Sequence, residues 1–224
     1  MKSTIAFFFL TLTVFNAKAQ ESNKWVSLFD GKTLSGWHSF KNPGMTPSWT
    51  VKDDAIYLDV TNKQGRGDLV TDKSFEDFHL KFEWKVAPKS NSGLIFLVDE
   101  KSKDASWQTG PEFQLIDNTG YPEPLGPKQY SGSLYDLIAC PAEYAKPTGE
   151  WNKSEIIVEK GRITFIVNDK KVVDALLWDK DWNALIAGSK FAGYKNFAKT
   201  SKGSLALQDH GGEVWFKNIM IKNL

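Results

Sequence analysis

Residues 110–118, with the sequence GPEFQLIDN, combine the alternation of a β-strand with side chains that could do chemistry. Successive side chains of a strand point to opposite faces, so Phe113 and Leu115 share one face while Glu112 and Gln114 share the other. The apolar face suits a hydrophobic core. A carboxylate beside an amide can bind hydroxyl groups or move a proton, but half-buried strands also turn a polar face to solvent. Both interpretations stay open for this segment alone.

Residues 204–212, with the sequence SLALQDHGG, repeat this arrangement almost a hundred residues later. The two leucines take one strand face, while Gln208 and His210 take the other. His210 stands between a carboxylate and a Gly-Gly turn, where an imidazole could act as a base or a metal ligand, or could simply bind a loop carbonyl. We predict that these two side chains converge with Glu112 and Gln114 on one concave sheet face.

The rest of the chain supplies strands that could position these groups. The clearest alternation, FHLKFEWKV at residues 78–86, predicts a half-buried antiparallel strand with His79 on its solvated face. The apolar run LIFLV at residues 94–98 suits a strand that is covered on both faces. Further strands are predicted within residues 25–37, 49–60 (two strands around Asp53-Asp54), 69–71, 112–116, 133–139, 155–158, 162–168, 171–174, 204–210 and 214–221.

About a dozen strands with almost no helix predict an all-β protein whose sheet folds on itself as a sandwich or barrel. Residues 176–202 break the pattern with a short helix at residues 181–187 and several aromatic residues, which either cover a binding face or close an open end of the sandwich. One inter-sheet core is predicted to contain six side chains from the strands with the strongest alternation. They are Phe82, Trp84, Phe113, Leu115, Phe165 and Leu207.

Residues 1–19 have the features of a secretory signal peptide. Lys2 precedes an apolar run at residues 5–15, and the small-residue site Ala17-Lys18-Ala19 follows. The apolar run is too short to span a bilayer. We therefore predict cleavage near Ala19, export to the periplasm or the extracellular space, and one β-sandwich domain over residues 20–224.

The charge balance excludes some classes of partner. Without the signal peptide the chain has 26 basic and 27 acidic side chains, a net charge of −1. Because no Lys/Arg cluster is present, we expect neither nucleic acid nor a membrane as a partner. Cys140 is the single cysteine, so no intrachain disulfide can form. Composition does not indicate an oligomeric state.

Seven segments in a fixed order connect the chain to a known family. They are LFDGKTLSGWH from Leu28, LVT from Leu69, NSGLIF from Asn91, GPEFQLIDN from Gly110, SGSLYDL from Ser131, KPTGEWNKSEIIVEKGRITFIVND from Lys146 and LALQDHGGEVWFKNIMIKNL from Leu205. Through these segments the chain resembles the 3-keto-disaccharide hydrolase family. The resemblance implies a concanavalin A-like, laminarinase-like β-sandwich with jelly-roll order, acting on sugars that carry a ketone at carbon 3.

On an oligosaccharide or glycoside of that kind, the ketone acidifies the hydrogen at carbon 2, and the glycosidic oxygen on carbon 1 lies β to the carbonyl. Elimination and addition of water then cleave the glycosidic bond. This chemistry needs a base near carbon 2, donors or a metal at the enolate oxygen, and an acid for the leaving oxygen. Glu112 and His210 are the predicted base and acid. The sequence identifies no cofactor with certainty and leaves a divalent metal ion open; if one is bound, the same two residues are its predicted ligands.

Other side chains are predicted to bind the sugar. Amides would orient its hydroxyl groups and rings would stack on it. Two further carboxylates have the opposite strand parity and would reach the site only through a bulge. The amides are Asn91, Gln114 and Gln208, the rings are Tyr135 and Trp151, and the carboxylates are Asp117 and Asp209.

Two other function classes stay open. A laminarinase-type retaining glycosidase shares this sandwich but needs two carboxylates about 5 Å apart. Glu112 and Asp117, however, point to opposite faces of a regular strand, and Gln114 occupies the position between them. A non-catalytic carbohydrate-binding module needs aromatic and amide side chains but has no use for a paired Glu112 and His210.

Overall fold

The structure, a computed structural model, describes residues 24–44 and 47–224, and strands dominate that part of the chain. The first eight strands are β1 (Val26–Ser27), β2 (Trp37–Ser39), β3 (Trp49–Lys52), β4 (Ala55–Leu58), β5 (Leu69–Thr71), β6 (Phe78–Val86), β7 (Asn91–Val98) and β8 (Glu112–Ile116). The remaining strands are β9 (Asn152–Glu159), β10 (Arg162–Val167), β11 (Lys170–Leu176), β12 (Ser204–Leu207) and β13 (Val214–Asn223). The helices are α2 (Lys180–Ala187) and the short 3-10 helices η1 (Ser106–Gln108), η2 (Pro127–Gln129), η3 (Ala142–Tyr144) and η4 (Lys190–Gly193).

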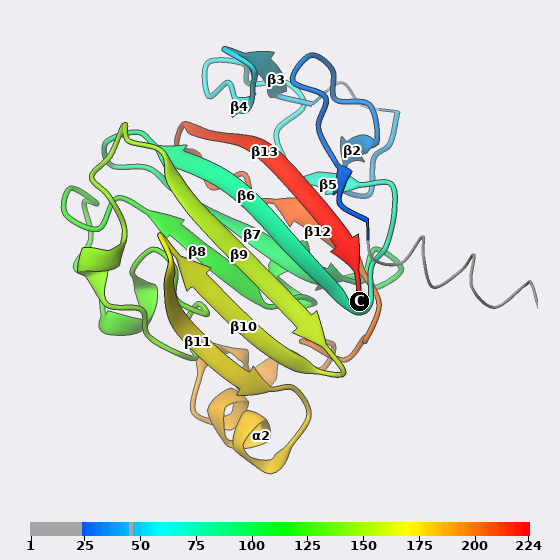
Figure 1. Cartoon of the computed structure of the whole chain (residues 1–224), viewed down its shortest axis with the longest axis vertical. Helices are drawn as coiled ribbons and strands as arrows, with labels where there is room; N and C mark the ends of the chain where they lie inside the picture. The colour runs from blue at the N-terminus through cyan, green and yellow to red at the C-terminus, as the bar shows by residue number, and fades with distance from the viewer. Residues whose placement is uncertain (1–23, 45–46) are drawn as a thin grey trace, which may run out of the picture.

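Within the described residues, the strands form two antiparallel sheets. The larger sheet has eight strands in the order β11-β10-β9-β6-β13-β4-β3, with β1 paired to β13. The smaller sheet has five strands in the order β2-β5-β12-β7-β8. Figure 1 shows the larger sheet lying across the smaller one, with α2 next to the β10–β11 edge. The predicted two-sheet antiparallel β-sandwich is confirmed.

Strand β6 follows the predicted alternation, with its even-numbered side chains buried and its odd-numbered ones on the outer face. His79 lies on this outer face as predicted, but it is only partly solvated. Its side chain is 16% exposed, and its Nε2 lies 2.5 Å from Oε2 of Glu155 on β9. In the antiparallel register of β6 and β9, Glu155 is paired with Lys81, two residues after His79. This register brings the carboxylate beside the imidazole. A pattern within one strand cannot reveal such a cross-strand partner.

Strand β7 is buried on both faces, as its apolar run predicts. The register between β7 and β12 shifts within the strand, and Leu97 adopts a left-handed φ of 55° there. Because of this bulge, Phe96 and Leu97 both pack into the main inter-sheet core, while Ile95 and Val98 both belong to a separate small cluster. The smaller sheet thus has an apolar patch on its outer face as well as on its inner face.

The six side chains predicted to share the inter-sheet core all belong to one buried cluster, which confirms that prediction. The ring of Phe113 links the two sheets, because its centroid lies 5.4 Å from that of Phe82 and 4.9 Å from that of Phe165. Full burial of such a ring stabilises a fold by about 1.5–3 kcal/mol. Strand β8 is therefore fixed against both β6 and β10.

Residues 133–139, predicted as a strand, form turns instead. The N–H groups of Leu137 and Ile138 both donate to the carbonyl of Leu134, and Asp136 has a left-handed φ of 59°. This turn lets Leu134 and Leu137 both reach the core. The alternation of strand side chains does not apply here, because a tight turn directs Leu134 and Leu137 to the core.

Residues 176–202 close an end of the sandwich. Helix α2 begins after Asp179, whose carboxylate accepts a hydrogen bond of 2.7 Å from the N–H of Trp182. The rings of Trp182, Phe191 and Phe197 join the core, and the last two stack with centroids 3.9 Å apart. Trp178 remains 41% exposed. Closing the sandwich is thus the main use of this aromatic segment.

None of the helices in residues 24–44 and 47–224 is long and apolar enough to cross a membrane. The predicted signal peptide lies outside these residues. Cys140 is a free and buried cysteine, and burial raises the pKa of its thiol to about 12.

Candidate functional site

A polar cavity of about 210 Å³ lies on the outer face of the smaller sheet. Its walls come from β7 and β8, from the residues that follow β12, and from η1, η4 and the turn after residue 133. The lining residues are Asn91, Trp107, Glu112, Gln114, Tyr135, Lys190, Gln208 and His210. Six of the nine predicted site residues therefore surround one cavity, including the four that were predicted to converge.

The pairing of β7 with its two neighbours explains this convergence. Gly93 pairs with Gln114 on β8, and the N–H of Gln208 donates to the carbonyl of Gly93 at 2.9 Å. Neighbouring strands lie about 4.8 Å apart, so polar groups on strands either side of β7 are within roughly 10 Å. The main-chain ladder brings together side chains that are distant in the sequence.

Gly93 makes room for the carboxylate of Glu112. A Cβ atom added to Gly93 would lie 2.2 Å from Oε1 of Glu112 and 2.7 Å from its Cδ. Such distances are far below van der Waals contact. The glycine is therefore required by the side chain that lies over it.

Glu112 is the buried acid of the cavity, with only 6% of its surface exposed. Burial raises its pKa from 4.5 to about 8; the charge of Lys190 opposes this shift, that of Asp68 adds to it, and the hydrogen bond with Gln208 opposes it. A carboxyl group with a pKa near neutrality suits general acid–base catalysis.

Two amide oxygens of the cavity have no partner. Among the described residues, Oδ1 of Asn91 and Oε1 of Gln208 are buried side-chain atoms without a hydrogen bond. Leaving such an acceptor unsatisfied costs about 1–3 kcal/mol. Acceptors of this kind match the hydroxyl donors of a polar ligand.

The structure adds Trp107 and Lys190 to the cavity, and sequence reasoning missed both. They belong to short 3-10 helices in irregular segments, where no periodicity assigns a face. The sequence signal was weak: Trp107 lies just before the GPEFQ strand, and Lys190 lies inside the aromatic segment. The ring of Trp107 packs edge-on against Tyr194, with centroids 5.1 Å apart.

Asp68, also missed, does not line the cavity, but its charge raises the pKa of Glu112. Its carboxylate accepts hydrogen bonds from the hydroxyl of Ser106 and, at 2.9 Å, from the N–H of Asp209. Burial raises the pKa of Asp68 despite these bonds. Its contacts with Ser106 and Asp209 connect the segments on both sides of the cavity.

The two carboxylates of opposite parity have structural partners instead of a place in the cavity. Asp117 accepts hydrogen bonds from the N–H groups of Lys89, Thr119 and Gly120 at 2.8–3.1 Å. Although burial favours its protonated form, these bonds lower the pKa of Asp117. This aspartate therefore organises the turn after β8.

Asp209 forms a two-pronged ion pair with Arg66, whose Nε lies 2.6 Å from Oδ2. The N–H of Gly67 also donates to Oδ2, at 3.0 Å. Burial favours protonation of Asp209, but the hydrogen bond from Arg66 and those from backbone N–H groups lower its pKa. Asp209 thus joins the loop after β12 to the segment before β5.

Trp151, predicted to stack on the sugar, lies with the other sheet. Nζ of Lys85 lies 5.1 Å from the centroid of its ring, and Nζ of Lys217 lies 4.1 Å from it. These lysines belong to β6 and β13 of the larger sheet. Alternation shows that a side chain leaves the core but does not show over which sheet it lies. The predicted role of Trp151 in sugar stacking is corrected accordingly.

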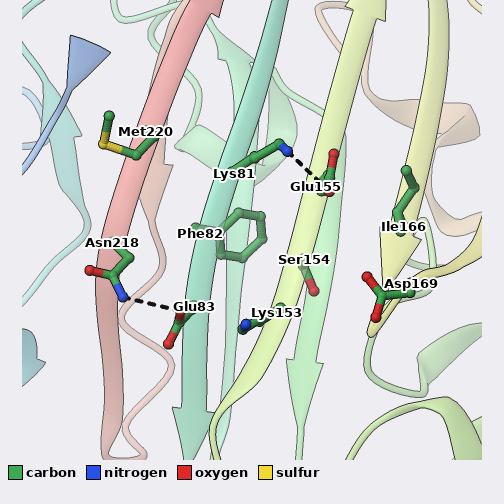
Figure 2. Close-up of a pocket in the computed structure, with 10 residues that line it drawn as sticks. All are labelled: Lys81, Phe82, Glu83, Lys153, Ser154, Glu155, Ile166, Asp169, Asn218 and Met220. Carbon is green, nitrogen blue, oxygen red and sulfur yellow. Dashed lines mark hydrogen bonds and ion pairs between the residues drawn. The ribbon is translucent and has the colours of Figure 1, made fainter. Parts of the chain in front are cut away.

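A second depression, of about 280 Å³, lies over β6, β9, β10 and β13 of the larger sheet (Figure 2). Two of its carboxylates have partners within the depression: Nζ of Lys81 lies 3.6 Å from Glu155, and Nδ2 of Asn218 donates to Glu83 at 3.1 Å. None of its buried polar atoms lacks a partner in the described structure. The smaller cavity is therefore the better candidate for chemistry.

The predicted metal ligands, Glu112 and His210, both line the cavity. In the part of the chain that the structure describes, His, Cys, Asp and Glu form no group of three or more that could hold a metal ion. Divalent ions usually take four or more ligands. The metal-binding role predicted for Glu112 and His210 stays a prediction.

Comparison with known proteins gives this cavity a context. Residues 24–222 match the family described as the 3-keto-alpha-glucoside-1,2-lyase-like domain. The chain belongs to this family. It is 35% identical to a 3-keto-disaccharide hydrolase of Bacteroides thetaiotaomicron, over 91% of this chain and 80% of that protein. The family makes it a carbohydrate-active protein.

Solved structures share the fold. One from Parabacteroides distasonis, assigned provisionally to the glycosyl hydrolases, has a TM-score of 0.82 and 31% identity, covering 95% of this chain and 98% of that chain. The Crh5 transglycosylase in complex with NAG has a TM-score of 0.54 and 12% identity, covering 90% of this chain and 84% of its own. The second likeness concerns the sandwich alone.

The substitution Gly93→Ala tests the fit of Glu112. We expect it to destabilise the protein by about 1–3 kcal/mol, because the new methyl group and the Glu112 carboxylate cannot occupy the same space. Denaturant unfolding measures the change. Gly44→Ala is the control, since no atom lies within 4 Å of its added Cβ. Equal stability of the two variants would contradict this packing.

The substitution Glu112→Gln tests the burial of the acid. Between pH 4.5 and about 8 the unfolded chain has lost the Glu112 proton while the folded protein retains it, so wild-type stability should fall with rising pH. The fall should approach about 1.4 kcal/mol per pH unit and should be missing in Glu112→Gln. Unfolding curves across this range measure it, with exposed Glu123→Gln as the control. Parallel curves for wild type and Glu112→Gln would contradict the burial.

Proposed function

We propose that the protein cleaves the glycosidic bond of 3-keto-glycosides by base-assisted elimination followed by hydration. The observation that carries this proposal is the buried carboxyl of Glu112, held beside Lys190 and two unpartnered amide oxygens in one polar cavity. Family membership and the similarity to a 3-keto-disaccharide hydrolase support it. The sequence of residues 1–19 adds the proposal that the protein acts after export.

The assigned roles follow from chemistry and position. The carboxylate of Glu112 takes the hydrogen of carbon 2, and the electron pair left behind forms the enolate with carbon 3. The enolate then collapses, the ketone forms again, and the bond between carbon 1 and the leaving oxygen breaks. His210, at the exposed rim of the cavity, gives that oxygen a proton. Water then adds a hydroxyl to carbon 1 and a hydrogen to carbon 2, while Glu112 releases its proton to solvent and His210 takes one up, so that both side chains return to their starting state.

The remaining groups of the cavity would hold the sugar. The acceptor oxygens of Asn91 and Gln208 suit ring hydroxyls, which are donors. Tyr135 offers a ring at the cavity wall. A cavity of about 210 Å³ matches a single sugar ring in scale, which leaves the departing group near the rim.

Neither rival class has comparable support. A double-displacement glycosidase needs a second carboxylate as nucleophile, and Asp117 is engaged by three backbone N–H groups away from the cavity. A binding module has no need of a buried acid with a raised pKa, since burying a carboxyl group costs stability. The structure of the cavity favours an enzyme.

The direct test compares a 3-keto-glucoside with the same glucoside unoxidised, measuring the released aglycone. Wild-type protein should cleave only the ketone, because the unoxidised sugar has no acidic hydrogen at carbon 2. Glu112→Gln should lower kcat by about a hundred- to ten-thousandfold and His210→Ala should also lower it, each with a smaller effect on KM. For wild type, kcat/KM should rise with pH up to about 8 as Glu112 loses its proton.

Two results would overturn this proposal. One is efficient cleavage of the unoxidised glucoside, which needs a nucleophilic carboxylate instead of an acidic hydrogen. The other is wild-type turnover by Glu112→Gln. Sugar binding that survives both substitutions, with no turnover by wild type, would indicate a binding module.

A further inference from the structure

Among the described residues, Lys190 is the one lysine or arginine that lines the cavity, and it has no part in the proton transfers proposed above. Its ammonium lies 4.0 Å from the ring centroid of Tyr135, 5.1 Å from that of Trp107 and 5.2 Å from that of Phe191. Rings at these distances attract a cation through their faces. The ammonium is thus held in position by aromatic groups.

The backbone around Lys190 is fixed as well. Its N–H donates to Oδ2 of Asp136 at 2.8 Å, and the hydroxyl of Ser189 caps the short helix by accepting from the N–H of Phe191 at 3.1 Å. Phe191 is buried in the core and stacks on Phe197. The lysine therefore projects from an anchored segment.

The hydrogen-bonding capacity of the ammonium is unused. Within the described residues, Nζ of Lys190 forms no hydrogen bond and no salt bridge, although an ammonium has three donors. Aromatic rings position a cation but leave its N–H groups available. Lys190 is an exposed residue, but its ammonium lies near three rings and lines the same cavity as a buried base. A charged donor positioned in this way stabilises negative charge as it develops.

We infer that Lys190 binds the oxygen on carbon 3 and stabilises the enolate that forms when Glu112 removes the hydrogen of carbon 2. This inference rests on the proposed function. In the step, the bond between carbon 2 and hydrogen breaks, the proton goes to Glu112, and the electron pair moves onto the carbon 3 oxygen beside the ammonium. Lys190 is then a catalytic residue that distinguishes a ketone from a hydroxyl group at carbon 3.

Lys190 also lowers the pKa of Glu112, and the test must separate this effect from stabilisation of the enolate. The charged groups coupled to Glu112 are Lys190 and Asp68, with His210 at the rim. Because the charge of Lys190 lowers the pKa of Glu112, its loss should move the rise of the pH–rate profile to higher pH. Enolate stabilisation, in contrast, determines the rate on the plateau above that rise.

The test isolates proton removal from bond cleavage. The 3-keto derivative of 1,5-anhydroglucitol has the acidic hydrogen at carbon 2 but no glycosidic leaving group, and its exchange with deuterium oxide can be followed by NMR. Wild type should catalyse this exchange. Lys190→Met should lower the plateau rate by about a hundred- to a thousandfold, as loss of an oxyanion donor does. Lys190→Arg should recover part of the rate, and the exposed Lys195→Met in the same segment should not differ from wild type.

The outcomes separate this inference from the proposed function. If wild type cleaves 3-keto-glucosides and exchanges carbon 2, but Lys190→Met exchanges at the wild-type plateau rate, the role of Lys190 is overturned and the proposed function stands. If only the pH of the rise moves, Lys190 adjusts the pKa of Glu112 and does not bind the enolate. If wild type neither cleaves nor exchanges, both are overturned. Thermal unfolding of each variant confirms that it is folded.

Discussion

The burial of one carboxyl group organises the candidate site. Glu112 belongs to a strand whose opposite face, at Phe113, is packed against the larger sheet, so the strand cannot rotate or slide to expose the acid. Gly93 on the neighbouring strand leaves the space that the carboxylate fills. Burial costs stability and raises the pKa of Glu112, and the well-packed core offsets that cost. A base of unusual strength is therefore maintained by the rigidity of the sandwich.

Elements outside the sheet complete the electrostatics of the site. Residues 176–202 bury Trp182, Phe191 and Phe197 to close the sandwich, and the same segment carries Lys190 to the cavity. Arg66 and Asp209 join two loops at the other side, while Asp68 contacts both Ser106 and Asp209. Changes that loosen the aromatic closure should consequently disturb the charge near Glu112, although they lie in the core.

Strand parity accounts for what the sequence could predict. The alternation along residues 110–118 and 204–212 places Glu112 and Gln208 opposite the core, and antiparallel pairing through β7 brings them together. The same rule could not locate Trp151, because leaving the core is possible over either sheet. It could not find Lys190 or Trp107, since these residues belong to short 3-10 helices in which apolar and polar side chains do not alternate. The roles of Asp117 and Asp209 depend on bonds to backbone N–H groups and to Arg66, which no side-chain pattern shows.

The most direct measurement follows the hydrogen of carbon 2 through the reaction. A 3-keto-glucoside deuterated at carbon 2 is cleaved in ordinary water, and the mass of the released sugar is determined at low conversion, with correction for exchange of the isolated product. If Glu112 removes this hydrogen before the glycosidic bond breaks, the product should have lost its deuterium. Direct displacement at carbon 1 would leave the deuterium in place, and a fully deuterated product would contradict the account.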